Sequence, residues 1–542
     1  MAFPSLGTIH RPTVTGTRGM VASAHPLASL AGTRILLDGG NAFDAVVAVA
    51  AALNVVEPYM SGIAGVGYAI INDAKNDRVR VLDYCGRTPH EARADLFDNV
   101  TDKDHGPRSC LTPGACGGWL ELLAQYGTMP AAKVFEPAIE LAENGYAVTV
   151  KNSEFMSNNG GRIYDNGAHV ILSKGRPPLP GEVLIQKDLA QTYRRVAEGG
   201  AEVFYRGDLG REVVNYIQRE GGWLSERDLA DFEVEWVDPV VTAYRDYEVF
   251  SPPPPSAGFQ ILETLNMLEG YDLAEIGHHS ELGLHLFIEA VRLANSDRIE
   301  YAAAPDAPIA GLLSKGYAAE RRKLIGDGAG VHRGEWYPAT KLPGEIEPGD
   351  PTAWLNECTT HFDVVDSDGN AVAITQSLGS GFGSGMIVGD TGMFLNNFIR
   401  WGDLVPGSPN CIEPHKKLDM CLSPLQVFRG GVFFSALGTP GSWGIQQTSV
   451  QFLTNVLDYG MNIQAAIEAP RFRIEGPGKQ VSIESRVSQS VRQALMARGH
   501  DVKVLPEFSP TCGGAQGIVA DAETGALMGG ADPRRDGYAI GI

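Results

Sequence analysis

A pair of threonines lies where a loose segment gives way to a strand-like pattern. The stretch NECTTHFDVV places Thr359 and Thr360 directly after a run that is rich in Gly and Pro. A threonine hydroxyl is a weak nucleophile unless a base lies beside it, and a threonine at a chain N-terminus carries that base as its own α-amine. Cleavage between Cys358 and Thr359 would create this arrangement. On the pattern alone, a strand start with solvated hydroxyls remains an alternative.

A second motif could stabilise negative charge. LGTPGSWG, which contains Gly441 and Ser442, lies between a strand-like end and a helix with one apolar face. Free N–H groups at a helix N-terminus favour anions, and an oxyanion forms when a nucleophile attacks an amide carbon. Many such turns bind nothing, so this motif alone leaves its role open.

The elements that must position these residues can be predicted from local signals. GGNAFDAVVAVAAALNVVEP predicts a buried helix that Asn41 caps and Pro58 ends. HFDVVDSDGNAVAITQS predicts a hairpin that turns at Asp368 and Gly369. Because strands and helices abound without strict βαβ alternation, we expect packed sheets flanked by helices. The segment from Gly326 to Glu357 is the predicted linker.

Composition narrows the function classes. The 542 residues include 44 Lys and Arg against 65 Asp and Glu, which gives a net charge of −21. Such a charge repels phosphate backbones and anionic lipid, so we expect neither nucleic-acid nor membrane partners. The seven cysteines form no CxxC motif, and the N-terminus has no signal-peptide pattern. We therefore expect reduced thiols and a cytoplasmic location.

Common cofactor and metal motifs are absent from the sequence. There is no GxxxxGK[ST], no HExxH and no GxSxG. HHSELGLH carries His278, His279 and His285 without a cysteine or carboxylate partner at metal spacing. Capping and surface roles are therefore the prediction for these histidines, and we expect no metal and no organic cofactor.

The chain resembles the γ-glutamyltransferase family of N-terminal nucleophile hydrolases. The matching segments occur in family order over nearly the whole chain, and they include GMVAS, GGNAFDAVVAV, LTPGACGGWLELLAQYGTMP, TTHFDVVDSDGNAVAITQS and GTPGS. The resemblance implies an α+β fold, a four-layer αββα sandwich. It also implies a proenzyme cut into a large subunit, residues 1–358, and a small subunit, residues 359–542. These would form one structural domain and a heterodimer, which could itself pair into a dimer.

The resemblance also implies roles for the polar residues. Thr359 would be the nucleophile, and Thr360 would orient its α-amine. Ser377 stands where the family has a hydroxyl bonded to the nucleophile. Gly441 and Ser442 stand at the positions of the oxyanion hole, and the serine keeps the backbone N–H that this role needs.

The residues that hold the α-amino acid end of a γ-glutamyl substrate in this family are replaced here. A cysteine stands in place of the arginine, with Arg87 two positions further on, and a Met-Cys pair replaces two serines. The remaining exchanges are Asn to Gly, Gln to Phe and an acidic residue to Trp. The expected substrate-binding positions are Cys85, Arg87, Gly379, Phe398, Trp401, Met420 and Cys421.

These departures favour a self-cleaving amidohydrolase or acylase whose acyl group is not γ-glutamyl. The chain looks like the side of the family that includes oxamate amidohydrolase and cephalosporin-acylase-like proteins, and Arg87 could meet a substrate carboxylate. One alternative is a γ-glutamyltransferase or glutathione hydrolase with a rebuilt substrate site. Another, from a different class, is an uncleaved binding scaffold without catalysis.

Overall fold

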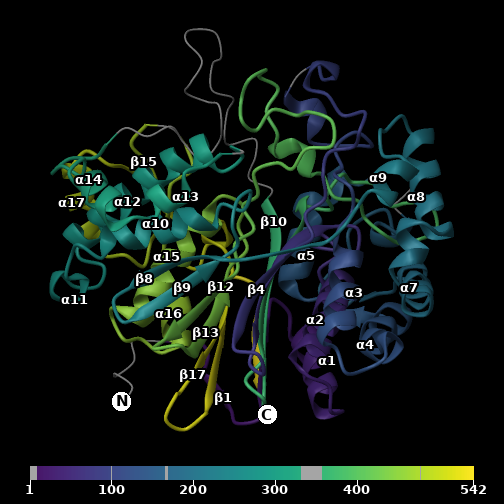
Figure 1. Cartoon of the computed structure of the whole chain (residues 1–542), viewed down its shortest axis with the longest axis horizontal. Coiled ribbons are helices and arrows are strands. Elements are labelled where there is room, and N and C mark those ends of the chain that lie inside the picture. The colour runs from purple at the N-terminus through teal and green to yellow at the C-terminus, as the bar shows by residue number, and fades with distance from the viewer. Residues whose placement is uncertain (1–8, 99, 165–168, 305, 331–356, 477) are drawn as a thin grey trace.

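Two seven-stranded antiparallel sheets lie face to face at the centre of the computed structural model, with helices outside each sheet (Figure 1). The structure describes residues 9–98, 100–164, 169–304, 306–330, 357–476 and 478–542. Most of the predicted linker, residues 331–356, lies outside these ranges. The four layers confirm the predicted αββα sandwich.

The first sheet contains the strand that begins with the threonine pair. All its neighbouring strands are antiparallel. In spatial order its strands are β19 (Tyr538–Gly541), β2 (Gly19–Ser23), β10 (Glu357–Asp366), β11 (Ala371–Ser380), β3 (Val66–Asp73), β4 (Arg78–Asp83) and β7 (Glu235–Val237).

The second sheet packs against the inner face of the first through small and apolar side chains, among them Met20, Ala371 and Ile518. Its strands in spatial order are β1 (Val14–Gly16), β18 (Leu527–Ala531), β17 (Gln516–Ala520), β13 (Val432–Gly438), β12 (Leu425–Arg429), β9 (Tyr247–Ser251) and β8 (Val240–Tyr244).

One helical layer covers each outer face, and each layer shares an apolar core with its sheet. The layer on the first sheet contains α1 (Pro26–Leu37), α2 (Ala42–Val56), α3 (Ala115–Tyr126), α4 (Ala131–Asn144), α5 (Val150–Asn159), α7 (Lys187–Tyr205), α8 (Asp208–Arg219) and α9 (Glu226–Ala230). The layer on the second contains α10 (Gly258–Leu268), α11 (Leu273–Ile276), α12 (Glu281–Tyr301), α13 (Ile309–Leu312), α14 (Lys315–Arg322), α15 (Gly444–Leu457), α16 (Ile463–Glu468) and α17 (Gln489–Ala497).

Short strands complete the fold at its periphery. A three-stranded sheet consists of β14 (Phe472–Arg473), β15 (Gln480–Glu484) and β16 (Asp501–Leu505), and a two-stranded pair consists of β5 (Tyr146–Ala147) and β6 (Val183–Leu184). None of the described helices is both long and apolar enough to cross a membrane.

Helix α2 is the buried helix that the sequence predicts. The Asn41 side chain accepts hydrogen bonds from the N–H groups of Phe43 and Asp44, and the Asp44 carboxylate binds the Asn41 N–H in return. All fifteen of its residues are buried, because α1 and α4 enclose it on the side away from the sheet. The helix ends at Val56, and Glu57 follows as its C-cap.

The predicted hairpin at Asp368 and Gly369 is confirmed as β10 and β11. Gly369 has φ +84°, in the left-handed region that glycine adopts without steric cost. The pairing is regular except beside Thr359, where the register passes from Cys358–Gly379 to Thr360–Gln376. One residue of β10 therefore faces two residues of β11. A bulge of this kind redirects side chains, and it lies at the predicted nucleophile.

Candidate active site

Thr359 lies at the bulge, with its hydroxyl directed at the neighbouring strand. Its Oγ1 lies 3.3 Å from Ser377 Oγ, and Ser377 Oγ also accepts a hydrogen bond from the N–H of Gly379 at 2.8 Å. The Thr359 side chain is 2% exposed. The structure therefore brings together the predicted nucleophile and the hydroxyl residue expected beside it.

Two charged residues that the sequence analysis missed contact the threonine pair. Thr360 Oγ1 donates a hydrogen bond to Glu57 Oε2 at 3.2 Å, and the Arg535 guanidinium donates to the Thr359 carbonyl at 2.8 Å. Both charged side chains are buried. The available signal was weak: Glu57 is a single acidic residue at the end of an apolar helix, and Arg535 belongs to the polar stretch DPRRDG.

The turn predicted to hold an oxyanion connects β13 to α15. Its two key residues have positive φ, +136° at Gly441 and +50° at Ser442, so the backbone reverses sharply before the helix. Their carbonyls accept hydrogen bonds from Gly444 and Ile445, and their N–H groups donate to no atom of the described residues. Such a turn leaves donors available at a helix N-terminus.

The turn is tied to the threonine strand through a close contact. A side chain at Gly438, the last residue of β13, would lie 2.4 Å from the His361 ring. That ring is fixed by Thr375 Oγ1 at 2.9 Å and Asp363 Oδ1 at 3.1 Å. Only glycine permits this approach, so β13 and its turn lie against the first residues of β10.

Five of the predicted substrate-binding residues lie in one apolar cluster with Trp443, which we call the apolar wall. The Phe398 and Trp401 rings stack at 4.8 Å on a short 3-10 helix, Phe398–Trp401. The proline-rich loop at 252–257 positions Met420, because Met420 exchanges backbone hydrogen bonds with Pro255 and Ala257. The apolar wall consists of Cys85, Phe398, Trp401, Met420, Cys421 and Trp443.

Gly379 connects the apolar wall to the nucleophile. Its N–H bonds Ser377, and its φ is +105°. A side chain at this position would lie 2.1 Å from Asn397 Oδ1 and 3.3 Å from Trp401 Cζ3. The absence of a side chain at Gly379 therefore leaves room for Asn397 and for the Trp401 ring beside it.

Arg87 lies outside the apolar wall, in an ion pair. Its guanidinium is 3.2 Å from Glu235 Oε1, and its side chain is 38% exposed. Lys417 joins the same group, at 2.8 Å from Glu235 and 2.6 Å from Asp83. The structure thus gives Arg87 a protein carboxylate as its neighbour.

Buried charges lie close behind the apolar wall. The Arg298 guanidinium is 3.9 Å from the Trp443 ring and 2.7 Å from Asp419 Oδ2. Burial raises the pKa of Asp419 to about 7, against the opposing effect of Arg298. Burial also lowers the pKa of Lys103 to about 8, while Asp403 opposes this.

One group of described side chains could bring metal-ligand atoms together. The ligand atoms of His285, Glu289 and His500 lie within 4.8 Å of one another. However, His285 Nε2 donates to the Gly326 carbonyl at 2.8 Å, its Nδ1 lies 2.9 Å from His500 Nε2, and the Glu289 carboxylate pairs with Arg292 at 2.5 Å. The cluster is therefore already hydrogen-bonded, and Arg292 opposes a cation. The predicted surface role of His285 is wrong: its partner, His500, comes from a distant segment and buries it.

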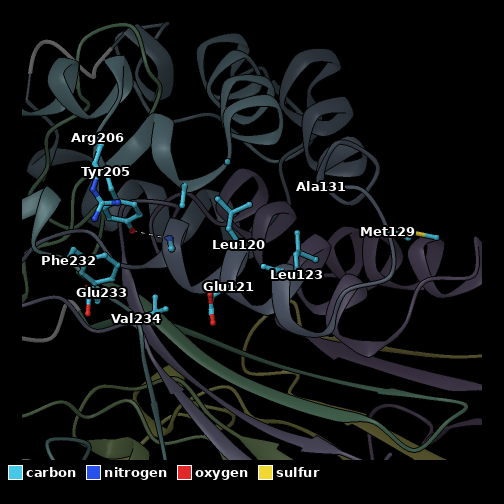
Figure 2. Close-up of a pocket in the computed structure, with 14 residues that line it drawn as sticks. Leu120, Glu121, Leu123, Met129, Ala131, Tyr205, Arg206, Phe232, Glu233 and Val234 are labelled. Carbon is cyan, nitrogen blue, oxygen red and sulfur yellow. Dashed lines mark hydrogen bonds between the residues drawn. The ribbon is translucent and has the colours of Figure 1, made fainter.

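A separate open pocket of about 690 Å³ lies in the helical layer of the first sheet (Figure 2). Its lining includes Leu120 and Glu121 of α3, Tyr205, which is the last residue of α7, and Arg206, which follows it. None of the predicted site residues lines this pocket.

Comparison with known proteins agrees with this arrangement. The model of the family described as gamma-glutamyltranspeptidase matches residues 28–542. The chain is 37% identical to the acylase ACY 1 proenzyme of Pseudomonas sp. strain SE83, over 99% of this chain and 95% of that protein. It is also 37% identical to the glutathione hydrolase-like YwrD proenzyme of Bacillus subtilis, over 98% and 99% of the two chains.

A solved structure gives the same result in three dimensions. The crystal structure of cephalosporin acylase from Bacillus halodurans superposes with a TM-score of 0.89 at 33% identity, and the match covers 100% of this chain and 98% of that one. The family model, the full-length relatives and the shared fold agree. This chain belongs to the gamma-glutamyltranspeptidase family and is an enzyme of its N-terminal nucleophile type.

Proposed function

We propose that this chain is a self-processing amidohydrolase or acylase whose nucleophile is Thr359. The observation that carries the proposal is the contact between Thr359 Oγ1 and Ser377 Oγ, where Thr359 of β10 faces the bulge of β11 directly after the predicted cut. The first reaction cleaves the chain itself, between Cys358 and Thr359. Thr359 Oγ attacks the carbonyl carbon of Cys358, and the C–N bond breaks as an ester forms, which frees the α-amine of Thr359. Water then hydrolyses the ester and releases the Cys358 carboxylate and the Thr359 hydroxyl.

The same groups then cleave a substrate amide. Thr359 Oγ attacks the amide carbon while its α-amine takes the hydroxyl proton and passes it to the departing amine. The N–H groups of Gly441 and Ser442 receive the oxyanion. Water hydrolyses the resulting acyl ester and restores the free threonine. Thr360 and Ser377 hold the amine and the hydroxyl in position.

Processing would produce a large subunit, residues 1–358, and a small subunit, residues 359–542. We propose that they remain one structural domain and work as a heterodimer, in which the small subunit begins with its nucleophile. The six cysteines whose side chains the structure describes are buried free thiols, which supports the predicted cytoplasmic location.

The apolar wall supports an acyl group that lacks a free α-amino acid end. Its rings and sulfur-containing side chains offer contact area but no counter-charge to a carboxylate or an ammonium group. The relatives named as acylases, including a cephalosporin acylase, support this reading. A second candidate is γ-glutamyl hydrolysis, which the relative named glutathione hydrolase-like supports at the same identity.

Denaturing electrophoresis tests the nucleophile directly. Purified protein should give two fragments, of roughly two-thirds and one-third of the chain, and the smaller should begin Thr-Thr-His-Phe. The variant T359A should remain one chain and hydrolyse no amide, because it lacks the attacking oxygen. T359S, which keeps a hydroxyl, is the matched control and should still be cut. A different new N-terminus, or a cut T359A chain, rejects Thr359 as the nucleophile and leaves the uncleaved scaffold or another residue.

A further inference from the structure

Two buried, oppositely charged side chains contact the threonine pair. Glu57 is 2% exposed and Arg535 is 3% exposed, and they contact Thr360 and Thr359 respectively. Glu57 comes from the end of α2, and Arg535 comes from the segment between β18 and β19. Three distant parts of the chain thus meet at the first two residues of the proposed small subunit.

The two contacts fix different parts of the pair. Arg535 holds the carbonyl of Thr359, which limits rotation of that peptide group. Glu57 holds the hydroxyl of Thr360, the residue proposed to orient the α-amine. Neither charged group contacts Thr359 Oγ1, whose described partner is Ser377. Their effect on the reaction would therefore pass through the position and charge state of the threonine.

The electrostatic surroundings of Glu57 couple it to this site. Burial raises the pKa of the Glu57 carboxyl to about 8, Asp536 also raises it, and Arg535 and the Thr360 hydroxyl lower it. Burial raises the pKa of the nearby Tyr59 and Tyr146 phenols, and the charge of Glu57 raises both further. Arg535 is thus the one cation that opposes the burial of this carboxyl among the groups that perturb it.

A second buried ion pair provides a contrast with Glu57 and Arg535. Arg534 and Glu484 lie 2.7 Å apart and are fully buried. Arg534 also donates to the carbonyls of Ile467 and Ala469, so its contacts tie segments of the small subunit together. The adjacent residue, Arg535, instead contacts the proposed nucleophile.

We propose that Glu57 and Arg535 are positioning residues for the reaction, which hold Thr359 and Thr360 and set the basicity of the α-amine. This inference rests on the proposed function of Thr359. After the cut, the new amine belongs to the residue whose carbonyl Arg535 binds, one position before the residue that Glu57 binds. The positive charge of the new amine favours the ionised form of Glu57, and the ionised Glu57 in turn raises the pKa of the amine, so the two groups titrate together.

The pH dependence of kcat/KM tests this role. A free α-amine has a pKa of about 7.7–8.0, and the base must be neutral, so activity should rise with pH through a limb near that range. E57Q keeps the size of the side chain and its hydrogen bond but removes the charge. We expect E57Q to be cut normally and to shift the limb to lower pH by about one unit.

Two further variants separate position from charge. E57A also removes the hydrogen bond to Thr360, so we expect slower processing and a fall in kcat of about tenfold with little change in KM. R535K keeps the positive charge but replaces the planar donor, so kcat should fall while the limb stays in place. E289Q makes the same exchange in another buried Glu–Arg pair and should keep the wild-type limb.

The outcomes are distinct. A limb in E57Q that stays in place, or moves to higher pH, overturns the inference. Should E57Q fail to fold, R535K decides: wild-type kcat and processing in that variant overturn the inference, and a selective loss of kcat supports it. Failure of the proposed function has a different signature, because T359A would then still be cut or still hydrolyse amides whatever the Glu57 variants do.

Discussion

The two sides of Thr359 differ in kind. On one side lie polar groups that contact Thr359 or Thr360, namely Ser377, Glu57 and Arg535. On the other lies the apolar wall, where rings and sulfur atoms pack without a free counter-charge for a substrate. Acyl transfer by a threonine requires fixed positions for a few polar atoms, whatever acyl group is bound. We propose that the choice of acyl group depends on the wall, so that this side could change without a change in the chemistry.

The arginines near the apolar wall are paired with protein carboxylates. Arg298 lies over the Trp443 ring and pairs with Asp419, and Arg87 pairs with Glu235. In each pair, the carboxylate already balances the charge of the arginine. A substrate carboxylate that entered the wall would have to compete with a protein carboxylate for either arginine. The wall itself contains no carboxylate that could pair with a substrate ammonium group, so we expect discrimination against that group to exceed every other specificity effect.

The largest expected effect is the preference between glutaryl and γ-glutamyl anilides. These substrates differ only in the α-amino group, which the γ-glutamyl compound would bring to the wall without a partner. Burial of an unpaired charged group costs several kcal/mol, and a loss of about 3 kcal/mol in transition-state binding lowers kcat/KM more than a hundredfold. Steady-state kinetics on the two anilides measure this ratio. A better γ-glutamyl substrate would show that the site has been rebuilt from other residues, and the second candidate function would then replace the first.

A smaller effect is expected from a substitution at Gly379, which lies between the nucleophile and the apolar wall. G379A would place its new methyl group against Asn397 Oδ1, whose hydrogen bond to the Ser380 N–H lies beside the nucleophile. We expect a loss of about 1–3 kcal/mol of stability and a fall in kcat/KM of about tenfold. G407A is the matched control, since Gly407 also has positive φ but no atom near its added Cβ. Thermal melts and kinetics on both variants test the comparison, and equal activity losses would contradict it.

The smallest effect is expected at Arg87. R87Q removes a half-exposed ion pair, while Glu235 keeps Lys417 as its partner. Such pairs contribute at most about 1 kcal/mol to stability, so we expect activity on uncharged acyl amides within about twofold of the wild type. R78Q, at another exposed pair, is the control. A large loss restricted to acyl groups that carry a carboxylate would instead identify Arg87 as a substrate contact.

Local signals in the sequence were enough for the elements, and less so for the contacts between them. The Asn41 cap and the turn at Gly369 depend on neighbouring residues, so α2 and the β10–β11 hairpin could be predicted. Glu57 and Arg535 each contact a threonine from far away along the chain, and no local pattern reports such pairing. The same reason explains why the burial of His285 by His500 was missed.

The candidate site was predicted mainly from the family motifs, and the contacts between its residues are visible only in the structure. The sequence identified Gly379 and Trp401 as exchanged positions but could not say that one exchange accommodates the other. The ring of Trp401 lies within van der Waals distance of the position where a side chain at residue 379 would begin. A pair of substitutions that looks like two separate losses is therefore one packing solution.

The order of strands in the first sheet determines whether the two chains could separate after the proposed cut. β10 and β11 are inserted between β2 and β3, and β2 in turn lies between β10 and β19. Strands from before and after Thr359 therefore alternate within one hydrogen-bonded sheet. Breaking the peptide bond there would not create two bodies that can drift apart, since separation would require stripping strands from the middle of the sheet. On dilution, the two chains of the processed enzyme should therefore stay associated and behave as one molecule.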